Sequence, residues 1–175
     1  SEKKFTEYPV FNSINWIEGN RTNAVYLDSK NRIWVGTNKG LGVYLIENDE
    51  FHIVKSNKGL DFGAIWTICE GIDNKIWFGS MGKGLFCIKD FEPFISNDIK
   101  NYTINNGLPN DYIYSILSDS TGNLWMSTNY GVCNFDVLNE TFSNYTTKDG
   151  LQGNEFNAGA YFKSKNGKLF FGGSK

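Results

Sequence analysis

A ten-residue signature recurs four times along the chain and restricts the fold more than any other feature. Each copy centres on an aromatic residue, and these residues lie 43, 48 and 45 positions apart: Trp34, Trp77, Trp125 and Phe170. A period of roughly 40 to 50 residues that accommodates several short strands is typical of the four-stranded blades of a β-propeller. The sequence therefore predicts an all-β fold, a β-propeller segment of four-stranded antiparallel blades, with three full blades plus parts of others.

The residues around each aromatic predict a hairpin followed by a strand. The aromatic side chain opens the second strand of its blade, where we expect it to pack between adjacent blades. Small residues such as Gly36 and Gly79 follow it, and we expect them where neighbouring backbones approach closely near the propeller axis. No segment shows the length and periodicity of a helix. Three residues before the aromatic lies a residue type that tolerates a positive φ angle, as short hairpin loops require: Asn31, Asn74, Gly122 and Gly167.

Gly-Leu pairs provide a second landmark with the same period. Three such pairs precede a predicted first strand, at Gly59-Leu60, Gly107-Leu108 and Gly150-Leu151. A propeller segment leaves unpaired edges and apolar blade faces, so we expect further propeller blades or a second chain to cover them. The two landmarks divide the chain into the outer strand of a preceding blade, three blades and a partial blade: residues 1–10, 20–56, 59–104, 107–147 and 150–175.

Composition and charge exclude several classes of function. The 17 Lys and Arg residues are scattered and the formal net charge is −2, so we expect neither nucleic acid nor an anionic membrane as a partner. No run of about eighteen apolar residues occurs, so we expect no direct membrane contact. The single histidine, His52, lies in a predicted outer strand, away from the axis, and no residues have the spacing of a metal site. We therefore expect no catalytic residues, no metal and no cofactor.

The three cysteines, Cys69, Cys87 and Cys133, are far apart and each lies among apolar strand residues. An odd number of cysteines does not form a complete disulfide framework. We therefore expect buried thiols.

Four short segments resemble the two-component regulator propeller repeat: residues 107–110 (GLPN), 116–119 (ILSD), 122–125 (GNLW) and 128–132 (TNYGV). The segments 149–157 and 167–173 are similar to the closing blade of the same family. The chain departs from the pattern at Gly71, where the other copies have Asp28 and Asp119. The resemblance implies the periplasmic sensor region of a hybrid two-component histidine kinase, which detects an oligosaccharide and signals to a cytoplasmic kinase.

Ligand binding in propellers uses the loops that enter each first strand and those that link second to third strands, because both lie on one face near the axis. Aromatic rings stack on sugars, while amides, carboxylates and guanidinium groups hydrogen-bond hydroxyls. These residues are candidates for contact with an oligosaccharide or another small polar ligand: Trp16, Arg21, Asp61, Phe62, Asn110, Asp111, Tyr112, Tyr130, Asn154 and Glu155.

Structural roles are an alternative explanation for some of these candidate residues. Tyr112 can anchor the packing between blades, and Asn110 and Asn154 can cap turns. Three other functions stay open at this point: a carbohydrate-binding lectin propeller, a scaffold for protein partners, and an enzyme of the streptogramin-lyase type.

Overall fold

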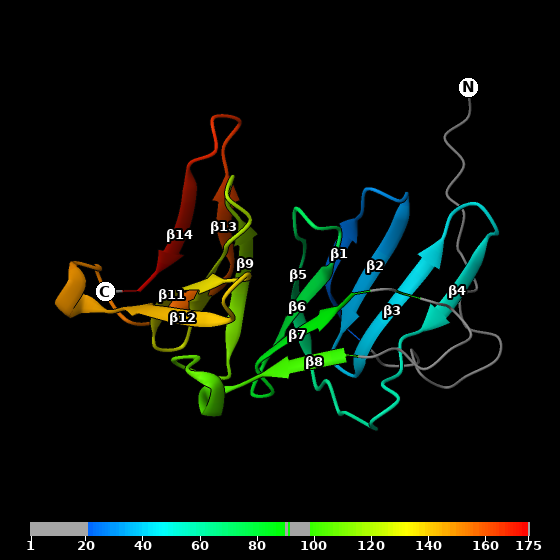
Figure 1. Cartoon of the computed structure of the whole chain (residues 1–175), viewed down its shortest axis with the longest axis horizontal. Helices are drawn as coiled ribbons and strands as arrows, with labels where there is room; N and C mark the ends of the chain where they lie inside the picture. Colours follow the sequence, from blue (N-terminus) through cyan, green and yellow to red (C-terminus); the bar gives the residue numbers. More distant parts are fainter. Residues whose placement is uncertain (1–20, 90, 92–98, 175) are drawn as a thin grey trace.

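The structure is a computed structural model that describes residues 21–89, 91 and 99–174. The predicted fold is confirmed: the described residues form three four-stranded antiparallel sheets and one two-stranded sheet (Figure 1). Trp16 and the predicted outer strand at residues 1–10 lie outside the described residues.

Within each full blade, the strands are ordered as they occur in the sequence. Blade 1 contains β1 (Thr22–Leu27), β2 (Arg32–Thr37), β3 (Gly40–Leu45) and β4 (Glu50–Ile53). Blade 2 contains β5 (Ile65–Glu70), β6 (Ile76–Ser80), β7 (Leu85–Ile88) and β8 (Ile99–Tyr102). Blade 3 contains β9 (Ile113–Ser118), β10 (Leu124–Thr128), β11 (Gly131–Asp136) and β12 (Thr141–Tyr145). Blade 4 contributes β13 (Phe156–Lys163) and β14 (Leu169–Gly173).

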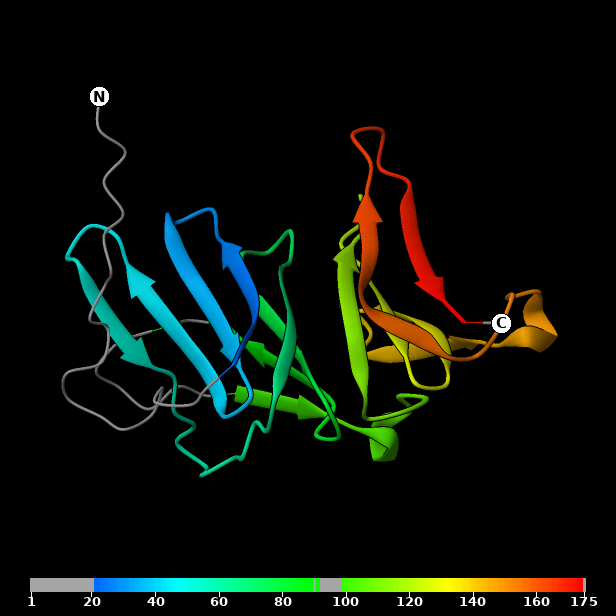
Figure 2. The same ribbon diagram turned by 180° about the vertical axis from the view of Figure 1, so that it is seen from behind.

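The first strands of successive blades are neighbours and surround a common axis. Contacts join β1 to β5, β5 to β9 and β9 to β13. Figures 1 and 2 show the outer strands β4, β8 and β12 turned away from this centre. Each blade therefore presents its first strand to the axis, as a propeller requires.

Two short 3-10 helices, which the sequence analysis did not predict, link blades 2 to 3 and 3 to 4. They are η1 (Ile104–Asn106) and η2 (Thr147–Asp149). Thr103 and Thr146 cap their first turns, and Gly107 and Gly150 end them in the left-handed conformation. Helices of three residues lie below the length at which a periodic pattern is visible in a sequence.

The hairpin residues have the backbone conformation that the signature predicts. Asn31 and Asn74 both have φ angles of 60°, and Gly122 and Gly167 have φ angles of 91° and 83°. These positive φ angles allow the chain to reverse between the first and second strands.

A carboxylate, buried in blade 1 and half-buried in blade 3, joins the hairpin to the signature aromatic. Asp28 is 5% exposed and accepts hydrogen bonds from the Trp34 indole nitrogen at 2.8 Å and from the Arg32 backbone nitrogen at 2.9 Å. Asp119 accepts from the Trp125 indole nitrogen at 2.9 Å. Burial by itself would raise the pKa of Asp28, but the hydrogen bonds from Trp34 and Arg32 outweigh it and lower the pKa.

Blade 2 lacks this carboxylate because Gly71 occupies the position. Its indole nitrogen, on Trp77, is buried and has no hydrogen-bond partner among the described residues. The departure noted in the sequence therefore leaves one buried donor unsatisfied.

Trp34 and Trp77 pack between blades, whereas Trp125 is half-buried and stacks on Tyr145 of its own blade, with ring centres 5.6 Å apart. Trp34 is fully buried and its ring meets that of Phe91 edge-on at 5.2 Å. Trp77 meets Phe135 of blade 3 at 5.6 Å. The expectation is wrong for Phe170, which is 53% exposed. The described residues include no blade after blade 4, so no described side chains of a following blade cover this ring.

The glycines after the aromatics make room for side chains of the next blade. A Cβ atom on Gly36 would lie 2.8 Å from Cγ2 of Ile65, and one on Gly79 would lie 2.6 Å from Cγ2 of Ile113. Ile65 and Ile113 are the first residues of β5 and β9. The nearest atoms belong to isoleucine side chains, and at Gly36 the backbone carbonyl oxygen of Ile65 is also close, 3.2 Å from the Cβ position.

Replacing Asp28 with Ala should destabilise the chain by about 1–3 kcal/mol, because it removes the acceptor of a buried indole and of a hairpin amide. Chemical denaturation followed by tryptophan fluorescence measures the change. The matched control is Asp73→Ala, which removes a hairpin carboxylate that pairs with Lys75 at 2.5 Å and is 35% exposed. Equal losses in the two variants would contradict a special role for the bond from the carboxylate to the indole.

Apolar side chains are exposed on the two outermost blade faces. Val25 and Leu27 on β1 are 67% and 58% exposed, and Phe162 on β13 and Phe170 on β14 are 63% and 53% exposed. Because Phe162 and Phe170 are directly paired across the strands, they form one patch. Such patches favour association.

The isolated chain should self-associate through these faces, with an average mass that rises with concentration in sedimentation velocity. Leu27→Glu combined with Phe162→Glu should shift the chain towards monomer. Leu138→Glu is the control, since Leu138 is 89% exposed and lies in the β11–β12 turn. A stable monomer over a wide concentration range would show that the exposed faces of blades 1 and 4 do not drive association.

Candidate functional site

The loops that the sequence analysis selected lie on one face of the propeller, which we call the loop face. Backbone hydrogen bonds join the loops between second and third strands to the residues that enter first strands. Asn129 donates to the Tyr112 carbonyl at 3.2 Å, and Gly82 donates to the Asp111 carbonyl at 3.0 Å. The loops that enter β5 and β9 lie at the bottom of Figure 1, opposite the β1–β2 and β13–β14 hairpins at the top.

Two of the candidate residues hold the linkers between blades. The Asp111 carboxylate accepts a hydrogen bond from the Ile104 backbone nitrogen at 2.9 Å, and the Asn154 amide oxygen accepts one from Thr147 at 2.9 Å. These are the equivalent bonds in successive blades. Asp111 and Asn154 therefore have a structural role that repeats with the fold.

Two further candidates also serve the fold. Asn110 accepts a hydrogen bond from the Tyr112 backbone nitrogen at 2.8 Å, which closes a turn. Phe62 is 6% exposed and packs edge-on against Phe78 and Phe86 at 5.3 and 5.2 Å. The expectation of ligand contact at Phe62 is corrected, because a ring in the core offers no face to a ligand.

Arg21 and Asp61 are exposed near blades 1 and 2. The Arg21 guanidinium lies 5.9 Å from the centre of the Trp66 ring. Asp61 accepts a hydrogen bond from the Gly63 backbone nitrogen and pairs with Lys83 at 3.2 Å, and both interactions lower its pKa. These groups lie on the surface, and among the described residues no hydrogen bond, ion pair or ring contact joins them to the other candidates.

The remaining candidates are Tyr112 and Tyr130 of blade 3 and Glu155, which immediately precedes β13 of blade 4. Together with Tyr114 and Asn129 of blade 3, we call them the tyrosine cluster. Tyr112 and Tyr130 are 43% and 54% exposed. The Tyr114 hydroxyl donates to the Asn129 amide oxygen at 3.2 Å. Burial raises the pKa of Tyr114, and the charges of Glu155 and Tyr112 add to this effect, as expected for neighbouring groups.

Tyr114 and Asn129 were missed by the sequence analysis. Asn129 lies in a loop beside the selected Tyr130, whereas Tyr114 lies in β9 at a register shift, between the residues that pair with Ser127 and Thr128. The period-two alternation of a strand breaks at such a point, so it did not indicate where the Tyr114 side chain lies.

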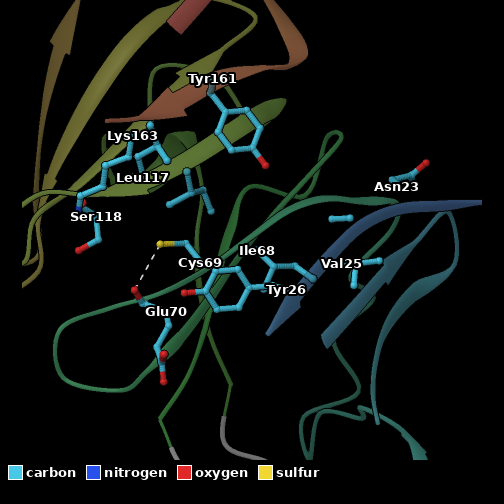
Figure 3. A pocket seen from close by; sticks show the side chains of 12 residues that line it. Asn23, Val25, Tyr26, Ile68, Cys69, Glu70, Leu117, Ser118, Tyr161 and Lys163 are labelled. Carbon is cyan, nitrogen blue, oxygen red and sulfur yellow. Dashed lines mark hydrogen bonds between the residues drawn. The ribbon is translucent and has the colours of Figure 1, made fainter. Parts of the chain in front are cut away.

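A second feature, the axial cavity, lies between the first strands and was also missed. It has a volume of about 410 Å³ and is lined by residues of β1, β5, β9 and β13 (Figure 3). Its polar and charged lining residues include Tyr26, Glu70, Ser118, Tyr161 and Lys163. The candidates expected from the sequence lie in loops, whereas these residues lie in strands.

The single histidine is remote from both features. His52 lies on β4, the outermost strand of blade 1, with Nε2 3.3 Å from a Glu50 carboxylate oxygen. The described residues contain no group of three or more His, Cys, Asp or Glu side chains placed to hold a metal ion. In the same residues, no helix has the length and apolar character needed to cross a membrane.

The three cysteines are free and buried, as predicted. Burial raises the pKa of Cys69 to about 11 and that of Cys87 to about 12, and it also raises the pKa of Cys133. The reactive thiolate is therefore scarce at neutral pH.

At about pH 8, the folded chain should react with an aromatic disulfide reagent far more slowly than free cysteine does, because its thiols are buried and protonated. The same chain in denaturant should react rapidly at all three positions. Absorbance of the released thiolate measures both rates. A rapidly reacting thiol in the folded chain would contradict the burial of that cysteine.

Comparison with known proteins identifies the repeats. The family model for the two component regulator propeller matches residues 17–39 and 107–130. The chain carries two-component regulator propeller repeats. It is also 30% identical, over 166 residues, to histidine kinase P4 of Formosa agariphila. That match covers 90% of this chain but only 12% of the length of the kinase.

Solved structures share the fold of these propeller repeats. The extracellular domain of a putative hybrid two component system from B. thetaiotaomicron matches with a TM-score of 0.71 and 19% identity, over 87% of this chain and 22% of that one. Virginiamycin B lyase from Staphylococcus aureus matches with a TM-score of 0.64 and 18% identity, over 87% of this chain and 48% of that one. At these identities, the likeness concerns the fold alone.

Proposed function

We propose that the chain is the ligand-sensing part of the extracytoplasmic propeller of a hybrid two-component sensor, and that it responds to an oligosaccharide. The observation that carries this proposal is the 30% identity to a histidine kinase over nearly the whole chain, together with the regulator propeller repeats. A periplasmic location is supported by the structural neighbour, which is the extracellular domain of such a system. The exposed blade faces support further blades or a second chain as partners.

The tyrosine cluster is the proposed contact surface on the loop face. Its exposed rings, Tyr112 and Tyr130, offer flat apolar surfaces that stack on sugar rings. Asn129 and Glu155 supply an amide and a carboxylate that hydrogen-bond hydroxyl groups. A surface of rigid aromatic rings and a few polar groups suits a polar ligand of moderate affinity.

The proposed role is sensing without catalysis. A propeller enzyme that uses histidine would need that side chain at the axis or the loop face, whereas His52 lies on an outermost strand. The lyase among the structural neighbours is related to the chain by fold alone.

Tyr130→Ala and Tyr112→Ala should each weaken oligosaccharide binding about tenfold, equivalent to about 1.4 kcal/mol, because each removes a stacking surface. A glycan array identifies the ligand with the full chain, and titration calorimetry then measures the affinity of each variant. Leu138→Ala is the control, since it removes an exposed apolar side chain from the outer edge of the same blade.

Two results would overturn parts of this proposal. If the array shows no bound glycan, oligosaccharide sensing is wrong. If a glycan binds and both tyrosine variants retain the affinity of the unmodified chain, the ligand site lies elsewhere. Thermal unfolding of the variants separates a lost contact from a lost fold.

A further inference from the structure

The axial cavity is lined by residues at equivalent positions in blades 2, 3 and 4: Glu70, Ser118 and Lys163. The last residue of each first strand pairs with the residue before the signature aromatic: Leu27 with Ile33, Glu70 with Ile76, Ser118 with Leu124 and Lys163 with Leu169. The residue before the aromatic is Ile or Leu in every blade, so its type is conserved from one repeat to the next. The first-strand residue differs in every blade, and we call this location the rim position.

Two rim residues have opposite charges and are held in place by neighbouring groups. The two carboxylate oxygens of Glu70 accept hydrogen bonds from Ser29, at 2.9 Å from its backbone nitrogen and 2.7 Å from its hydroxyl. Lys163 Nζ donates to the Ser118 carbonyl at 2.7 Å. A carboxylate offers about four lone-pair sites and an ammonium group three donors. Both groups therefore retain capacity for a ligand while their positions are fixed.

Two tyrosines add aromatic surface to the same cavity. Tyr161 pairs with Phe171 at the position occupied by Val25, Ile68 and Ile116 in the other blades. Blade 4 therefore has a phenol ring where the repeat has branched aliphatic side chains. Figure 3 shows Tyr161 and Tyr26 entering from different walls of the cavity.

We infer that the axial cavity binds one ring of a neutral polyhydroxylated ligand, with hydroxyl groups between Glu70 and Lys163 and ring faces against Tyr26 and Tyr161. Sugar hydroxyls both donate and accept, so one ring satisfies a carboxylate and an ammonium group together. A ligand with a net charge is repelled either by the Glu70 carboxylate or by the Lys163 ammonium group. The volume of about 410 Å³ lies in the range of small-ligand pockets. The inference rests on the proposed function only for the class of ligand.

Variants that restore the repeat residue test this inference with little risk to the fold. Tyr161→Ile introduces the residue of blades 2 and 3, and Lys163→Ser introduces that of blade 3. Saturation-transfer NMR on the full chain uses four probes, the methyl glycosides of glucose, galactose, mannose and xylose, with methyl glucuronide as the charged counterpart of the glucoside. At least one neutral glycoside should bind, and each variant should raise its dissociation constant at least fivefold.

Lys165→Gln is the matched control, because Lys165 lies in the exposed β13–β14 hairpin close to Lys163 and outside the cavity lining. It should leave binding unchanged. The inference is overturned if no neutral glycoside binds, if only the glucuronide binds, or if Tyr161→Ile and Lys163→Ser both bind as well as the unmodified chain.

The same experiment separates this inference from the loop-face proposal. Binding that is lost in Tyr130→Ala and kept in both axial variants would support the loop face and overturn the axial site. Binding that is lost only in the axial variants would place the ligand in the cavity and overturn the role of the tyrosine cluster.

Discussion

The Trp77 indole lies between two blades, with the Phe135 ring of blade 3 at 5.6 Å and the Tyr102 ring of its own blade at 6.1 Å. The other parts of the fold depend on contacts of this kind. A four-stranded sheet has two apolar faces and cannot bury them alone, so each blade is stabilised by the next one. The glycines that admit Ile65 and Ile113, and the carboxylate that holds the Trp34 indole, all serve this packing.

This dependence divides the chain into two sets of positions. Positions that pack one blade against the next repeat, because each interface has the same geometry. Positions that face the axis, and positions exposed to solvent on the loop face, do not pack against another blade and are free to differ. There the chain has Glu70, Ser118 and Lys163 at one equivalent position, and Tyr161 where other blades have aliphatic residues. Both proposed binding surfaces consist of residues that differ between blades.

The fold was predictable from the sequence because its determinants repeat. The spacing of Trp34, Trp77 and Trp125 predicted the blades, and Asn31 and Asn74 predicted hairpins with positive φ angles, as the structure has them. Phe170 shows the limit of that reasoning. The signature fixes where this aromatic lies in its strand, whereas its burial depends on whether another blade lies against it.

The candidate site was predictable only in part. The choice of loops located Tyr112, Tyr130 and Glu155, but it also selected Phe62, which is in the core, and Asp111, which holds a linker. Ring burial and hydrogen bonds to the backbone are tertiary properties that residue type alone does not specify. The axial cavity was missed because it forms only when first strands from four blades, far apart in the sequence, surround one axis.

Hydrogen exchange of the chain with and without its bound glycan tests most directly whether repeated positions serve the fold and non-repeating positions bind ligand. The account predicts that slower exchange on binding is confined to residues 112–114, 128–130 and 155 at the tyrosine cluster and to residues 26, 70 and 161–163 at the axial cavity. The β3–β4 and β11–β12 hairpins should exchange at unchanged rates. Ligand-induced protection centred on those hairpins or on the outer strands β4 and β12 would contradict it.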